Sequence, residues 1–305
     1  MSNKFTNRRR QPRSPPICIS KPPKPPYPPY PYSAAAGGGP LTRTQQWVKD
    51  STLPPVPARP YEKITVRNLA FHLYPNPRNP AWFRNLHELK KRWPLFNGRR
   101  LIAVATGPGL VSPDIIKQYL GPNADYLEIS NDPRLRETRT FLPLLRELRS
   151  IACNEATFYA HSKGASSHHP DDDGKRIAIR YWRNRMYSEL LDRWPAVAAT
   201  LERYTACGTF KIDYSLLEHY VMYSPTGYYW GNWHFAGNFY WFRHDCIFRN
   251  PHWSEIGDDP YAVEMWLGKL LDTGDAHSIY QPWVPTEHPP PDLYNPSSHV
   301  DPIRD

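Results

Sequence analysis

The middle of the chain alternates short apolar runs with segments whose apolar residues recur at helical spacing. Apolar runs near 99–106 (RRLIAVAT), within 124–130 (DYLEIS) and within 155–161 (ATFYA) predict buried strands. Between the first two, Ser112 is placed to cap a short helix ending at Leu120. The segment 133–151 puts its apolar residues on one helical face, and Pro143 should kink or split that helix.

Strands joined by helices predict an α/β fold with a doubly wound, mostly parallel sheet flanked by helices. We expect the three strands to be adjacent and parallel. Further helices are expected at 79–93, 175–192, 195–204 and 260–271, and residues 205–250 are strand-rich and aromatic. The α/β domain should span 61–275.

Composition separates the two ends of the chain from this domain. Residues 1–60 hold 15 prolines, 10 Lys or Arg and one acid, so we expect a disordered basic Pro/Tyr-rich segment with polyproline II character. It is either a solvated tether or a ligand for an aromatic-lined groove. Residues 276–305 should form a Pro-rich tail, with Tyr280 and Trp283 as anchors.

The net charge of +9 resides in that first segment, because residues 61–305 hold 28 charged residues of each sign. A neutral domain argues against nucleic acid as a partner. The four cysteines form no CxxC pair, which excludes the usual zinc and disulfide patterns and suits a reducing compartment. We expect a cytoplasmic protein, since the sequence has no membrane span of 18 apolar residues and no apolar segment of a secretory signal.

Candidate chemistry lies where the predicted strands end, because parallel sheets bind ligands beyond the carboxyl ends of their strands. The first strand ends at Thr106 and Gly107, and the second is followed by Asn131. The Gly-Pro-Gly after Thr106 matches no phosphate-binding fingerprint and can equally be a turn.

The third strand ends in His161, Ser162, Lys163 and Gly164. A lysine suits phosphate, a histidine can donate to an anion or move a proton, and a glycine permits close backbone approach. The alternative is a polar strand end that merely begins a loop.

The stretch HFAGNFYWFR (234–243) is a second candidate. His234, Gly237, Asn238 and Trp241 could line a sugar site, since rings stack on pyranose faces and amides bind hydroxyls. For Trp241 and its neighbour Phe239, an aromatic core strand is the competing interpretation.

Glu264 stands in an otherwise apolar helix start. If buried near a pocket it could serve as a base, with Asp258 and Asp259 next in line, and otherwise it is a surface carboxylate favoured by the helix dipole. Asp171 and Asp173, in the loop SSHHPDDDGKR, are candidate ligands for a divalent metal, although such runs are commonly solvated loops.

Together these stretches resemble a family of bacterial glycosyltransferase-like proteins of the rhamnan-synthesis type. The family pattern is similar to FYAHSKG followed by a helix with Trp182 and Arg183 in RYWRNRMY, then WHFAGNFYW, then an acid–aromatic pair in VEMWLG. The resemblance covers about residues 61–280. It implies a glycosyltransferase-A-like (GT-A-like) fold and a nucleotide-sugar donor.

The resemblance also implies roles for individual residues. In that fold the strand after the second crossover helix usually ends in an Asp-x-Asp motif that holds a divalent cation on the donor diphosphate, whereas here it ends in His161-Ser162-Lys163. This departure leaves a role for Mn²⁺ or Mg²⁺ open, since Lys163 could supply part of the cation's charge. Glu264 occupies the place where inverting members keep their base.

The resemblance predicts a transferase that moves a sugar from a nucleotide-sugar donor to a glycan or surface-polysaccharide acceptor. A non-catalytic nucleotide- or carbohydrate-binding relative is the alternative, and the missing Asp-x-Asp favours it. In the transferase, Glu264 and His161 would be catalytic. Donor-binding residues would be Thr106, Gly107, Asn131, His161, Ser162, Lys163 and Gly164.

Overall fold

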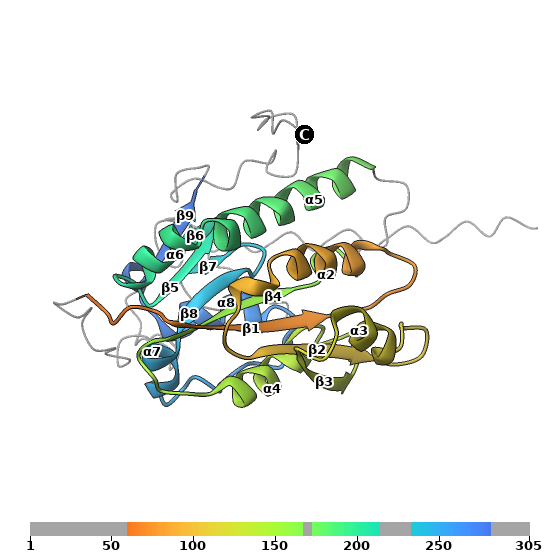
Figure 1. The fold of residues 1–305 in the computed structure, drawn as a ribbon, viewed down its shortest axis with the longest axis horizontal. Helices are drawn as coiled ribbons and strands as arrows, with labels where there is room; N and C mark the ends of the chain where they lie inside the picture. The colour runs from red at the N-terminus through yellow and green to blue at the C-terminus, as the bar shows by residue number, and fades with distance from the viewer. Residues whose placement is uncertain (1–59, 167–172, 214–232, 282–305) are drawn as a thin grey trace, which may run out of the picture. The chain divides into compact units, whose positions relative to one another are not determined.

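The computed structural model describes residues 60–166, 173–213 and 233–281. These residues form a seven-stranded sheet in the order β3-β2-β1-β4-β8-β5-β9 (Figure 1). Every strand except β8 runs in the same direction, and β8 is antiparallel to its neighbours β4 and β5. The strands are β1 (Val66–Leu73), β2 (Arg100–Thr106), β3 (Asp125–Ser130), β4 (Glu155–His161), β5 (Ala206–Thr209), β8 (Tyr240–Arg243) and β9 (Ala276–Tyr280).

Successive residues of a strand point to opposite faces of the sheet. Apolar strand residues lie on both faces, and helices cover both. On β4, Phe158 and Ala160 pack with one apolar cluster and Tyr159 with another. The first cluster holds α2 (Ala81–Lys91), α3 (Pro113–Leu120), α5 (Asp173–Tyr187) and α6 (Trp194–Leu201). The second holds α4 (Thr138–Leu148), α7 (His244–Arg249) and α8 (Ala262–Leu270). The predicted doubly wound, mostly parallel α/β fold is thus confirmed.

Short elements complete the described chain. These are the 3-10 helices η1 (Trp93–Leu95) and η4 (Thr273–Asp275), the π-helix η2 (Ser188–Asp192), and an antiparallel ribbon of β6 (Lys211–Asp213) and β7 (Trp233–Phe235).

One predicted adjacency is wrong. The strands predicted at 99–106 and 124–130 are neighbours and parallel, but β1 lies between β2 and β4 and pairs with both. Polar Asn68 and His72 interrupt the apolar pattern of β1, although both are buried. Asn68 Oδ1 accepts a hydrogen bond from the Arg99 amide at 2.7 Å, which ties the start of β2 to β1.

The two sequence features predicted within helices, a cap at Ser112 and a break at Pro143, have different outcomes. Ser112 caps α3, as predicted, by accepting a hydrogen bond from the Asp114 amide. Pro143 lies inside α4 without splitting it.

The sheet includes Ala276–Tyr280, so it extends five residues past the predicted domain boundary at 275. The predicted disorder of 1–60 falls almost wholly outside the described residues, as does the tail beyond 281. No helix in the described ranges is both long and apolar enough to cross a bilayer.

Candidate functional site

A cavity of about 490 Å³ opens at the carboxyl ends of β1, β3 and β4. It is also bordered by the start of α4, by α5 and by the start of α8, so both helical layers contribute to its walls. Its walls include His72, Tyr74, Asn131, Arg136, Glu137, His161, Ser162, Lys163, Gly164, Ile179, Trp182, Tyr261 and Glu264. A concave site with several convergent polar groups at this edge is where an α/β sheet binds a ligand.

The turn after β4 is held by contacts with neighbouring elements. Asn85, on α2, donates to the Lys163 carbonyl at 3.0 Å, and the Ser162 hydroxyl accepts a hydrogen bond from the Tyr74 amide at 2.8 Å. Gly164 has a φ of +84°, and a Cβ there would lie 2.9 Å from Ile179. These contacts hold the Lys163 side chain at the cavity wall without using its ammonium group.

His161 forms a buried pair with Glu137. Its Nδ1 lies 2.5 Å from Glu137 Oε2, and the carboxylate also accepts hydrogen bonds from the Asn238 amide at 3.2 Å and the Tyr159 hydroxyl at 3.3 Å. Burial raises the pKa of Glu137, but its interactions with His161 outweigh this, with help from His72 and Asn238, and lower it to about 2. Glu137 is therefore a carboxylate at neutral pH.

The second ring nitrogen of His161, Nε2, is covered from solvent and has no hydrogen-bond partner among the described residues. Buried polar atoms are normally satisfied, because leaving one unpaired costs about 1–3 kcal/mol. With Nδ1 held by Glu137, Nε2 is the nitrogen of this cavity-lining histidine that is left without a partner among the described residues.

His72 adds a neutral imidazole to the same wall. The Thr140 hydroxyl donates to the Glu137 carbonyl at 3.0 Å, so the 2.8 Å contact with His72 Nδ1 must place the proton on the histidine. Burial lowers the pKa of His72 to about 4, with Glu137 opposing this shift. His72 thus presents Nε2 as an acceptor at neutral pH.

Lys163 and Glu264 bring opposite charges to the cavity without pairing. The Lys163 ammonium lies 4.3 Å from the centroid of the Trp182 ring. Neither the ammonium nor the Glu264 carboxylate forms a hydrogen bond or ion pair with another described residue. Burial lowers the pKa of Lys163 and raises that of Glu264, and each group partly opposes the shift of the other.

Arg136 supplies a second cation at the cavity. It precedes α4 with a φ of +52°, a left-handed conformation that few non-glycine residues adopt. Its guanidinium lies 5.7 Å from the ring centroid of Tyr261. Two cations and one unpaired carboxylate therefore converge on one cavity.

The residues predicted to contact sugar lie in the core. Trp241 is fully buried, donates its indole N–H to the Leu190 carbonyl at 2.9 Å and stacks on Phe96, so the expectation that it contacts a sugar is wrong. A Cβ on Gly237 would lie 2.8 Å from Met186 Sδ, so the close approach at this glycine is to α5.

The other two residues of that set are buried as well. Asn238 binds Glu137 and thereby supports the cavity from behind. Burial lowers the pKa of His234 to about 4, with the charge of Lys163 adding to the effect.

The remaining predicted site residues differ in whether they line the cavity. Asn131 lines it, whereas Thr106, Gly107, Asp258 and Asp259 do not. The Asp259 carboxylate instead accepts a hydrogen bond from the Tyr261 amide at 2.8 Å, just before α8.

The predicted metal ligands find no support in the described residues. Asp171 lies outside them, and the Asp173 side chain is likewise not described. Within the described ranges, no three His, Cys, Asp or Glu side chains gather as a metal site. The oxygens of Glu137 are taken by His161, Tyr159 and Asn238. The described cavity residues therefore do not fit Mn²⁺ or Mg²⁺, and we assign no step to a metal.

Sequence reasoning missed Glu137, Arg136 and His72. A signal for Glu137 was present, because it precedes Phe141, Leu144 and Leu148 at spacings of four, three and four and so falls on the apolar face of α4.

No family model and no curated protein matches this chain. It is similar to a solved structure assigned as a nucleotide-diphospho-sugar transferase from Desulfovibrio desulfuricans G20, at 10% identity and a TM-score of 0.34 over 70% of this chain and 80% of that one. It is also similar to a 4-diphosphocytidyl-2C-methyl-D-erythritol synthase, at 12% identity and a TM-score of 0.33 over 76% of this chain and 96% of that one.

A third similar structure is core-mannan synthase A from Aspergillus fumigatus in an Mn/GDP form, at 13% identity and a TM-score of 0.33 over 70% of this chain and 73% of that one.

Proposed function

We propose that this protein is a glycosyltransferase that takes a sugar from a nucleotide-sugar donor and transfers it to a glycan acceptor. The observation that carries the proposal is the cavity in which Lys163, Arg136 and Glu264 converge without ion pairs among themselves or to other described residues. The three sequence blocks that resemble glycosyltransferase-like proteins supply the substrate class.

In the proposed reaction, the carboxylate acts on the acceptor and the two cations act on the leaving group of the donor. The Glu264 carboxylate accepts the proton of an acceptor hydroxyl, and that oxygen bonds to the anomeric carbon of the donor sugar. The bond from the anomeric carbon to the diphosphate oxygen breaks, and Lys163 and Arg136 stabilise the negative charge of the leaving nucleoside diphosphate.

We assign His161 to the donor diphosphate as well, beside Lys163 and Arg136. Because Glu137 holds Nδ1, the ring is oriented with Nε2 as its remaining donor or acceptor toward a bound diphosphate. Asn131, Ser162 and Gly164 also line this cavity, and we assign them to donor binding as well.

A non-catalytic binding module of the same fold is the second candidate. The observation in its favour is that the described Asp and Glu side chains do not gather into a metal site. A two-stage experiment separates the candidates. A thermal-shift panel of nucleoside diphosphates, with and without Mn²⁺, tests binding, and release of nucleoside diphosphate from nucleotide-sugars tests catalysis. Binding with turnover supports the transferase, binding without turnover supports the module, and no binding contradicts both.

A further inference from the structure

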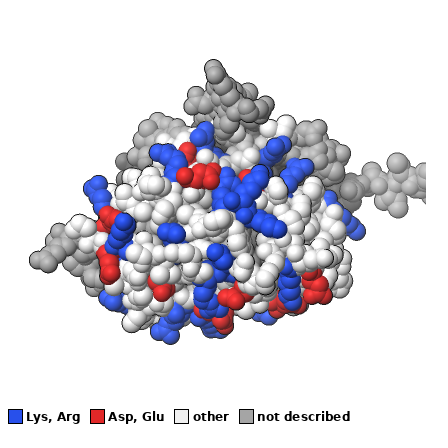
Figure 2. Space-filling view, in the orientation of Figure 1, with Lys and Arg blue, Asp and Glu red and all other residues white. Residues whose placement is uncertain are grey.

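A second pocket, of about 420 Å³, lies between α2 and α5 and shares no lining residue with the first cavity. Arg84, on α2, and Arg180 and Arg183, on α5, line it. Lys and Arg side chains gather over these two helices in the space-filling view (Figure 2). Consecutive residues of α5 thus serve different cavities, Trp182 the first and Arg183 the second.

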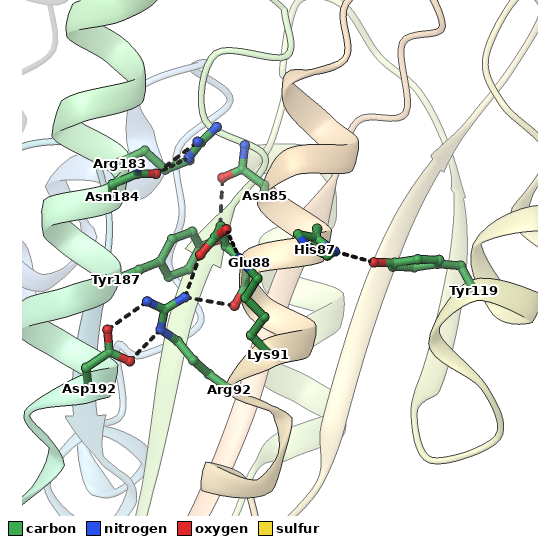
Figure 3. Close-up of polar contacts among 10 residues, drawn as sticks. All are labelled: Asn85, His87, Glu88, Lys91, Arg92, Tyr119, Arg183, Asn184, Tyr187 and Asp192. Carbon is green, nitrogen blue, oxygen red and sulfur yellow. Dashed lines mark hydrogen bonds and ion pairs between the residues drawn. The ribbon is translucent and has the colours of Figure 1, made fainter. Parts of the chain in front are cut away.

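The buried arginine of this pocket forms no ion pair with an acid in the described part of the chain. Arg183 is 4% exposed, and its guanidinium extends from α5 toward α2, where its one hydrogen-bond partner among the described residues is the side-chain oxygen of the neighbouring Asn184 (Figure 3). Those two hydrogen bonds use two of its five N–H groups. Buried charges in proteins are ordinarily paired, since taking an ion out of water costs several kcal/mol.

The acid that lines this pocket, Glu88, is already engaged in ion pairs. Glu88 lines the pocket, but its carboxylate binds Lys91 at 2.8 Å and Arg92 at 2.9 Å (Figure 3). Neither Arg84 nor Arg180 forms an ion pair within the described ranges. Burial lowers the pKa of Arg183; Tyr187 and the charge of Glu88 oppose this shift, whereas the charges of Arg180 and Arg84 add to it, so the three guanidinium groups repel one another.

We infer that this pocket is a binding site for a phosphate group. Three arginines that line one recess match a multiply charged oxyanion, because arginine N–H pairs bind phosphate oxygens in a bidentate manner. A bound phosphate would relieve the repulsion and supply the counter-charge that Arg183 lacks. The exposed ring of Phe83, at the pocket wall, gives an apolar surface to the group that carries the phosphate.

The test measures inorganic phosphate binding to the full chain by calorimetry. Arg84→Gln combined with Arg180→Gln should weaken binding by about 10- to 150-fold for each guanidinium removed. Both side chains are exposed, so the double variant should keep its fold. Arg139→Gln is the matched control, because Arg139 is exposed on α4, on the opposite face of the sheet.

Lys163→Ala separates this pocket from the first cavity: the phosphate binding that the double arginine variant loses should persist in Lys163→Ala. The inference is overturned if phosphate does not bind at millimolar concentration, if Lys163→Ala abolishes binding, or if Arg139→Gln weakens it as much as the double variant. Vesicles of phosphatidylcholine containing phosphatidic acid show whether the bound phosphate group belongs to a lipid headgroup or to a soluble ligand. Binding to these vesicles that the double variant loses assigns the phosphate to a lipid headgroup, and binding to free phosphate alone assigns it to a soluble ligand.

Discussion

Glu137 Oε2 and His161 Nδ1 lie 2.5 Å apart, which joins the start of α4 to the end of β4 across the floor of the candidate site. The pair is buried and is supported by Tyr159 and Asn238. It fixes the orientation of the His161 ring and leaves Nε2 without a partner among the described residues, and it does so with a carboxylate that stays ionised. The stability and pH dependence of the protein should reveal this arrangement.

Glu137→Gln should destabilise the protein by on the order of 3 kcal/mol at pH 7, since it breaks a buried pair whose carboxyl pKa is lowered from 4.5 to about 2. A lowered carboxyl pKa stabilises the fold above the unfolded-state value of 4.5, and this contribution is lost as pH falls from there toward 2. Urea unfolding at several pH values should therefore show the difference between wild type and variant shrinking below pH 4.5.

Glu147→Gln is the control for that change. Glu147 is half exposed on α4 and only approaches Arg99 at 3.6 Å, so its loss should cost under 1 kcal/mol. Equal losses in the two variants, or a difference that does not depend on pH, would contradict the buried pair.

Buried neutral histidines should make the protein sensitive to mild acid. Burial lowers the pKa of His72 and His234 to about 4 and that of His244 to about 3. Unfolded histidine titrates near 6.5, so stability is complete above that pH and falls as the pH drops toward 4, by up to about 1.4 kcal/mol per pH unit for each group. The denaturant midpoint should be lower at pH 5 than at pH 7.5, and an equal or higher midpoint at pH 5 would refute the neutral burial.

Gly237→Ala should destabilise the fold by roughly 1–3 kcal/mol, because the φ of +88° disfavours a side chain and the new Cβ would meet Met186. Gly274→Ala is the matched control, since its Cβ would meet no atom within 4 Å. Thermal unfolding of the two variants compares them directly. A neutral Gly237→Ala would return this glycine to the set of ligand-contacting candidates.

Glu264→Gln should reduce turnover by roughly 10²- to 10⁴-fold while donor affinity and melting temperature stay nearly unchanged. The reason is that the Glu264 carboxylate has no structural partner among the described residues, so its loss breaks no hydrogen bond there. Because burial raises its pKa above 4.5, the wild-type rate should rise with pH through a limb above that value. Turnover is measured as nucleoside diphosphate released.

Asp258→Asn is the control, since Asp258 is exposed before α8 and lies outside the cavity walls. If Glu264→Gln lowers stability and leaves the activity of the folded fraction intact, Glu264 is not the base.

Patterning predicted β2, β3 and β4 but not β1. β1 carries the polar Asn68 and His72, whose burial depends on partners 31 and 68 residues away. Those partners, Arg99 and Thr140, come together only once the chain is folded.

The site was predictable to the extent that strand ends define it. Lys163 and Glu264 follow from a strand end and a helix start, and the structure places both at one cavity. Residue type alone could not separate ligand contact from packing in Trp241, which fills the core. Arg136 depends on a left-handed backbone conformation that no spacing reveals.

The most direct test of the proposed transferase is nucleoside-diphosphate affinity in Lys163→Ala. Lys163→Ala should weaken binding by about 10- to 150-fold, because one charged contact is worth roughly 1.5–3 kcal/mol, and should leave the melting temperature nearly unchanged. Lys117→Ala, in a lysine of α3 that pairs with Glu128 outside the cavity, should bind as wild type does. Calorimetry that finds equal affinity in wild type and in folded Lys163→Ala would contradict the assignment of this cavity to the donor diphosphate.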